Sequence, residues 1–92
     1  MSVAVKIPTQ LRALTDGSDE VAADGRTVAE VIESLESRHP GIRTRLLDDS
    51  GGLRRFVNVY LEDEDVRFLD GIATAVPDGA RISIIPAVAG GR

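Results

Sequence analysis

The feature that most constrains this 92-residue chain is one amphipathic helix placed between segments that alternate like strands. The segment Thr27-Val28-Ala29-Glu30 is a capping box, in which the threonine hydroxyl caps the backbone and the glutamate reaches back. The apolar residues from there on recur at i, i+3, i+4 and i+7, so they lie on one side of a helix that ends at Pro40-Gly41. This stripe consists of Val28, Val31, Ile32 and Leu35.

Strand-like segments lie on both sides of the helix. The predicted strands are residues 3–7, 20–23, 56–61, a short strand at 66–67, and a last strand that begins at residue 81. The loop after the first strand is longer than a tight hairpin needs, so Leu11 and Leu14 are expected to fold back onto the body. Residues 42–47 are expected to add a short turn of helix.

This order predicts the α+β class, with one mixed sheet and one main helix packed across one of its faces. The ubiquitin-like β-grasp is the best-known arrangement of this order, and it pairs the first and last strands at the centre. We expect a domain over residues 1–86 and a flexible di-glycine tail over residues 87–92. The helix residues Val31, Ile32 and Leu35 should pack against the sheet. Their predicted partners are Val5, Val57, Val59 and Ile84.

The tail begins where the last strand loses its ladder. Pro86 has no N–H, and the five residues Ala87, Val88, Ala89, Gly90 and Gly91 can reach roughly 16 Å from the body. Glycine has no Cβ, so the Gly90-Gly91 pair fits a channel too narrow for other residues. Such a tail suits delivery of its own end into another protein's active site, and a frayed terminus is the alternative.

Composition excludes several classes of function. The chain has 11 Lys and Arg against 15 Asp and Glu, a net charge of −4, so it is a poor candidate for binding nucleic acid. It has no cysteine, and no apolar run long enough to span a membrane. The start of the chain lacks a signal-peptide pattern, so a cytoplasmic protein is expected. Lys6 is the only lysine.

No set of residues predicts catalysis or a metal site. The acidic run 62–65 lacks the spacing of a calcium loop and is interpreted as a solvated turn. The single histidine, His39, ends the helix without a nucleophile in a matching pattern. Gly51-Gly52 lacks the lysine and hydroxyl residue of a phosphate loop and is interpreted as a flexible linker. The chain is therefore not expected to be an enzyme by itself.

The sheet face away from the helix is expected to carry apolar groups. If Ile82 and Ile84 face the helix, Ile85 faces away, as do Phe56 and Tyr60. An apolar patch of this kind often marks a partner surface. Alternatively, loop residues such as Leu53 or Leu69 cover it.

The strand and tail Ile84-Ile85-Pro86-Ala87-Val88-Ala89-Gly90-Gly91 are close to the terminal pattern of a known family. Over essentially its whole length the chain resembles the ubiquitin-like sulfur carriers, which include the thiamine-biosynthesis carrier and the small subunit of molybdopterin synthase. The segment Arg55-Phe56-Val57-Asn58-Val59-Tyr60-Leu61-Glu62-Asp63-Glu64-Asp65-Val66-Arg67 looks most like the carrier used in the thiocarboxylate route to cysteine.

The resemblance implies a mechanism in which partners hold every cofactor. An E1-like activating enzyme would use ATP and Mg²⁺ to join the Gly91 carboxylate to AMP, and sulfur would then displace AMP to leave a thiocarboxylate. In the cysteine branch a cysteine-synthase-like partner with pyridoxal phosphate would receive the sulfur, and a zinc metalloprotease would release the product. Thiamine, molybdopterin and sulfur-containing secondary metabolites are alternative destinations.

The resemblance also implies a partner-binding patch. At one position the chain departs from the family pattern. The patch consists of Ile85, with Pro8 and Phe68 as weaker members. Carriers of this kind work with a terminal Gly-Gly, whereas here Arg92 follows. Arg92 is therefore removed before activation, or it is foreign to the natural protein. A ubiquitin-like protein modifier and an inert interaction module remain as alternative functions.

Overall fold

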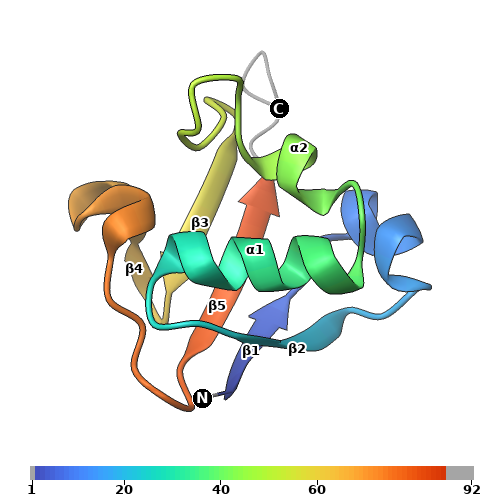
Figure 1. The fold of residues 1–92 in the computed structure, drawn as a ribbon, viewed down its shortest axis with the longest axis horizontal. Helices are drawn as coiled ribbons and strands as arrows, with labels where there is room; N and C mark the ends of the chain where they lie inside the picture. Colours follow the sequence, from blue (N-terminus) through green and yellow to red (C-terminus); the bar gives the residue numbers. More distant parts are fainter. Residues whose placement is uncertain (1, 87–92) are drawn as a thin grey trace.

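The centre of the fold is a five-stranded mixed sheet in a computed structural model that describes residues 2–86. The first and last strands lie side by side and run parallel, with Val5 opposite Ile82, while every other neighbouring pair is antiparallel. The spatial order is β2-β1-β5-β3-β4 (Figure 1). The strands are β1 (Ser2–Lys6), β2 (Glu20–Asp24), β3 (Val57–Leu61), β4 (Glu64–Asp65) and β5 (Arg81–Pro86). The predicted fold class is confirmed, and the predicted tail lies outside the described residues.

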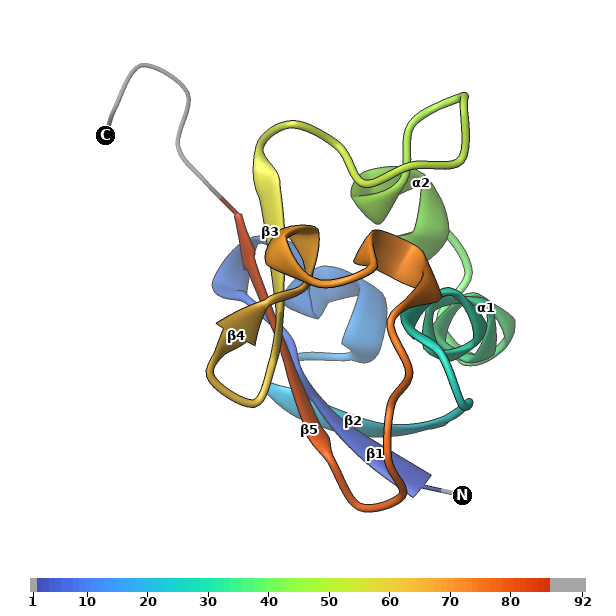
Figure 2. The ribbon, with the colours of Figure 1, turned by 90° about the vertical axis from the view of Figure 1, so that its left-hand side faces the viewer.

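Two α-helices lie on one side of this sheet (Figure 2). The main helix α1 (Val28–Arg38) crosses the sheet, and α2 (Ile42–Leu46) is the short turn predicted after it. Three 3₁₀ segments complete the described chain, η1 (Thr9–Thr15), η2 (Val66–Phe68) and η3 (Gly71–Ala73). None of the described helices is long and apolar enough to cross a bilayer.

The predicted capping box forms at the start of α1. The Thr27 hydroxyl accepts a hydrogen bond from the Glu30 backbone N–H at 3.2 Å. The Glu30 carboxylate reaches back to the N–H of Arg26 at 2.9 Å, one residue before the cap. Just upstream, a Cβ on Gly25 would lie 2.7 Å from the backbone nitrogen of Val31, so glycine is required where the chain turns into the helix.

The core lies between α1 and the sheet, as the stripe predicted. Val31, Ile32 and Leu35 are at most 3% exposed and belong to one buried cluster with the strand residues expected to face them. Leu11 is also buried in this cluster, and Leu14 packs against it, so the long loop does fold back onto the body. The expected strand partners in this cluster are Val5, Val57, Val59 and Ile84.

The predicted short strand at residues 66–67 is wrong. The two-residue strand is β4, which pairs Glu64 with Leu61 and Asp65 with Tyr60. A carboxylate oxygen of Asp65 accepts from the Arg67 backbone N–H at 2.9 Å, and this cap starts a 3₁₀ turn at the next residue. That turn points Val66 into the core, where it is fully buried.

The loop that contains Gly51-Gly52, which the sequence suggested to be a flexible linker, is closed by hydrogen bonds to Asp48. Asp48 accepts hydrogen bonds from the Ser50 N–H, the Ser50 hydroxyl and the Gly52 N–H, at 2.9, 2.6 and 3.2 Å. These bonds from Ser50 and Gly52 hold the pKa of the Asp48 carboxyl below its usual value. The segment is therefore a closed turn within the domain, on the way from α2 to β3.

Candidate docking surface at the end of the last strand

The end of β5 separates buried from exposed side chains as predicted. Ile82 and Ile84 are buried against the helices, whereas Ile85 is 47% exposed on the other face. Phe56, just before β3, is 52% exposed. The alternative that loop residues cover this face of the sheet is therefore wrong for Ile85 and Phe56. Leu53 packs against the core cluster instead.

On the β1 side of β5, a groove brings two of the predicted patch residues together. Lys6 lies opposite Ser83 in the parallel ladder, and the chain leaves β1 shortly before Pro8. Pro8, Ile85 and Pro86 all line this groove. We call these three residues the β5-end surface. It adjoins the point where the described chain ends and the predicted tail begins.

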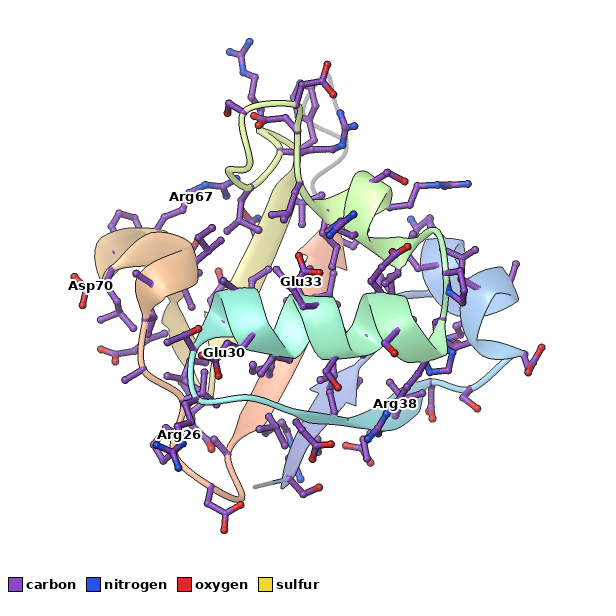
Figure 3. All side chains as sticks on the ribbon, in the orientation of Figure 1. Arg26, Glu30, Glu33, Arg38, Arg67 and Asp70 are labelled. Carbon is purple, nitrogen blue, oxygen red and sulfur yellow. The ribbon has the colours of Figure 1, made fainter. Side chains whose placement is uncertain are left out.

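On the β3 side of β5, the surface is polar and braced. Asn58 is the Cα partner of Ile85, and its side-chain oxygen accepts from the Arg67 guanidinium at 2.6 Å. A second arm of Arg67 donates to the carbonyl oxygen of Arg54. Figure 3 shows Arg67 reaching from η2 toward the loop that leads into β3. This side chain therefore ties η2 to the end of the sheet.

The third predicted patch residue, Phe68, lies outside the groove. It follows Arg67 in η2 and is 86% exposed, but it does not line the groove with Pro8 and Ile85. Phe56 was not predicted as a patch residue, although the alternation along residues 56–61 already placed it on the open face together with Asn58.

The arginines of this surface were also missed. Arg12 lines the groove of the β5-end surface, and its Nε donates to the Ile7 carbonyl at 3.0 Å. Nothing local in the sequence distinguishes Arg67 from the other arginines, because its acceptors lie nine and thirteen residues away. Arg12 bonds to a carbonyl only five residues away, but its place in the groove with Ile85 depends on the pairing of β1 with β5.

The described residues hold no cluster for a metal. Across residues 2–86 no group of three or more His, Cys, Asp or Glu side chains is arranged to bind an ion. The acidic run 62–65 turns from β3 into β4, with Glu62 in the left-handed region at a φ of 55°. What this end of the molecule offers is an exposed surface with fixed side chains, beside the end of the last strand.

Comparison with known proteins agrees with this geometry. The family model described as "ThiS family" matches residues 5–91. The sulfur carrier protein CysO of Mycobacterium tuberculosis is 54% identical over 93 residues, which cover 99% of this chain and all of that protein. A chain in the crystal structure of the Amycolatopsis orientalis BexX/CysO complex is 53% identical, with a TM-score of 0.91, covering 97% of this chain and 99% of that one.

A relative with a different kind of name matches less of the chain. Small archaeal modifier protein 3 of Haloferax volcanii is 44% identical over 68 residues, which cover 74% of this chain and 73% of that protein. The fold, the near full-length identity and the family match through residue 91 agree with one another. The chain therefore belongs to the ThiS family and is a sulfur carrier protein with the ubiquitin-like β-grasp fold, a carrier and not a catalyst.

Proposed function

We propose that this chain carries sulfur as a thiocarboxylate on Gly91 and donates it for the synthesis of cysteine. The family match that runs through residue 91, together with 54% identity to the sulfur carrier protein CysO, carries this proposal. The fold supports it, because β5 leaves the sheet at Pro86 beside an exposed apolar surface. A partner that docks there receives the segment Ala87 to Gly91 directly.

The first step is activation of the carboxylate. A carboxylate resists attack by sulfur because it is negatively charged and hydroxide is a poor leaving group. With ATP and Mg²⁺ on an E1-like enzyme, a Gly91 carboxylate oxygen attacks the α-phosphate and pyrophosphate leaves. Sulfide-level sulfur then attacks the carbonyl carbon, the bond from carbon to the AMP oxygen breaks, and a thiocarboxylate remains. This chain contributes the carboxylate, the reach of its tail and the docking surface.

The second step is donation of the sulfur. The thiocarboxylate is a soft nucleophile, and a cysteine-synthase-like enzyme with pyridoxal phosphate supplies the electrophilic carbon that it attacks. A shift of the acyl group from sulfur to nitrogen then leaves cysteine joined to Gly91 through an amide bond. A zinc metalloprotease hydrolyses that amide and regenerates the carrier. The proposed location of the carrier is the cytoplasm, where ATP is available to these partners.

Docking is assigned to the β5-end surface, with Phe68 as a second contact. Ile85 is the central residue because it is the exposed apolar side chain nearest the end of β5. Gly90 and Gly91 then enter a channel that has no room for a side chain.

Arg92 must be removed before the first step. An added residue moves the terminal carboxylate roughly 3.5 Å along the chain. It also brings a long cationic side chain to a channel shaped for glycine. Small errors in the position of a reacting group cost large factors in rate. The metalloprotease that releases cysteine also performs this trimming.

The decisive experiment compares the chain that ends at Gly91 with the chain that ends at Arg92. Each is incubated with the cognate activating enzyme, ATP, Mg²⁺ and sulfide, and followed by ATP–pyrophosphate exchange and by intact mass. The shorter chain should exchange and gain the mass of sulfur in place of oxygen, while the longer chain should do neither. Equal exchange from both chains contradicts the trimming step, and no exchange from either contradicts the proposed function.

A second candidate function is protein modification, favoured by the 44% identity to small archaeal modifier protein 3. The same activated Gly91 carbonyl forms an amide with a target lysine instead of accepting sulfur. Because Lys6 is the only lysine, chains of this protein on itself have a single possible side-chain linkage. Conjugate ladders on a denaturing gel, without a thiocarboxylate mass, would favour this function.

A further inference from the structure

We infer that the activating partner presents two acidic side chains around an apolar pocket, because the fold fixes Arg12 and Arg67 on either side of Ile85. The inference rests on the proposed function and names the chemistry of the surface that docks at the β5 end. The two arginines come from opposite neighbours of β5. Arg12 follows β1, and Arg67 is held against β3.

Arg67 is fixed although it is exposed. Its guanidinium donates to the Asn58 side chain at 2.6 Å and to the Arg54 carbonyl, nine and thirteen residues away in sequence. A guanidinium has five N–H donors, so these two bonds leave donors for a further acceptor. Because Asn58 is the ladder partner of Ile85, this remaining capacity lies next to the exposed apolar side chain.

Arg12 is fixed in a similar way on the other side. Its Nε donates to the Ile7 carbonyl at 3.0 Å, and its side chain is half-buried in the groove that Pro8 and Ile85 line. The carbonyl bond uses the Nε donor and leaves the terminal nitrogens of the guanidinium for another partner. Less rotamer entropy is lost on binding when such side chains are already held in place.

Neither arginine has an acidic partner within residues 2–86. The ion pairs found there join Arg38 to Asp24 and Arg43 to Glu33, with nitrogen to oxygen distances of 2.7 and 2.8 Å. The molecule as a whole has a charge of −4, and beside Ile85 it presents these two cations without an acidic side chain bonded to either. A fixed guanidinium matches the planar, two-oxygen geometry of a carboxylate.

The apolar residue between the two cations selects the kind of partner. A free phosphate satisfies guanidinium groups but has nothing to cover Ile85. A protein surface with an apolar pocket between two Asp or Glu side chains satisfies all three groups together. The two arginines also repel a partner with a basic rim, which supports specificity.

The test measures affinity for the cognate activating enzyme, without ATP, at several salt concentrations. The chain ending at Gly91 is compared with its Arg12→Gln and Arg67→Gln variants and with Arg26→Gln as the control. Arg26 is exposed and lies near the opposite end of the molecule from Arg67 (Figure 3). Each of the first two variants should bind about tenfold more weakly at low salt and lose affinity less steeply as salt rises. The control should bind like the unchanged chain.

The salt dependence separates an ionic contact from a purely structural role. If Arg67 only braces the loop before β3, Arg67→Gln lowers the melting temperature while the salt dependence of the remaining affinity stays the same, and the inference is overturned. Arg67→Lys should keep the salt dependence and recover part of the affinity. Wild-type affinity in both variants, or an equal loss in Arg26→Gln, also overturns the inference. Failure of the proposed function looks different, because the unchanged Gly91-ended chain then supports no ATP–pyrophosphate exchange.

Discussion

The two faces of the sheet are built from the same alternating strands, but they are completed in different ways. On the helix face, Val5, Val59 and Ile84 are at most 4% exposed because they pack in one buried cluster with residues of α1, α2 and η1. On the open face, Ile85 and Phe56 remain about half exposed, and the neighbouring polar groups bond to one another. Residues on the covered face should therefore determine stability, and residues on the open face should determine association.

The largest expected effect tests the covered face. Leu35 is 1% exposed, so Leu35→Ala should lower the free energy of unfolding by about 2–5 kcal/mol, through lost burial and a residual cavity. Chemical denaturation followed by circular dichroism measures it. The matched control is Ile85→Ala on the open face, which removes a similar side chain that is already partly in water. Equal losses from the two variants would break the comparison between the faces.

The next effect tests the open face. Ile85→Asp should leave the unfolding free energy nearly unchanged and weaken binding to the activating enzyme by about tenfold or more, because a charge enters an apolar contact. Calorimetric titration of the Gly91-ended chain measures this affinity. Phe68→Asp, made in parallel, shows whether Phe68 belongs to the same contact. Full affinity in Ile85→Asp would remove the β5-end surface from the docking site.

The covered face could be predicted from the sequence, since its signals are local. A capping box and an apolar stripe at helical spacing define α1, and strict alternation defines which residues of β1 and β3 face it. The two-residue strand β4 was missed because its boundary depends on a carboxylate that caps the next turn. The alternation of Val66 and Arg67 covers only two residues, which is too short to distinguish a strand from a 3₁₀ turn.

The docking surface could be predicted only in part. The exposure of Ile85 follows from alternation, and the nearness of Pro8 follows once β1 and β5 are placed side by side. The roles of Arg12 and Arg67 do not follow, because Arg12 comes near Ile85 only once β1 and β5 pair, and Arg67 depends on a carbonyl and an amide brought near by the fold. In Arg67 those acceptors are nine and thirteen residues away. Local patterns therefore identify what is buried better than they identify what is held ready on the surface.

A smaller effect is expected at the helix cap. Thr27→Ala removes the acceptor for the Glu30 N–H and should lower the unfolding free energy by about 1 kcal/mol. Thr27→Ser keeps the hydroxyl and should recover most of that loss. Both should bind the activating enzyme like the unchanged chain, since the cap supports the covered face. A loss of affinity in Thr27→Ala at unchanged stability would show that the faces are coupled.

The smallest effect is a pH dependence where α1 meets α2. The Glu36 carboxylate accepts from the backbone N–H groups of Arg43, at 2.9 Å, and Gly41, at 3.2 Å. These bonds hold the pKa of Glu36 below its ordinary value of 4.5. A carboxyl group with a lowered pKa in the folded state stabilises the fold above its unfolded pKa, and this contribution disappears as the pH falls through the folded pKa.

The unchanged protein should therefore lose stability as the pH falls below about 4.5, and Glu36→Gln should lose less over the same range. Melting temperatures between neutral pH and pH 3 measure the difference, which should be small because the Glu36 side chain is partly exposed to solvent. Glu64→Gln is the control, since the Glu64 side chain accepts no hydrogen bond within residues 2–86. Binding to the activating enzyme at neutral pH should be the same for both variants, because Glu36 lies on the helix side of the sheet. Parallel pH profiles for Glu36→Gln and the unchanged protein would show that the junction between α1 and α2 holds without this carboxylate.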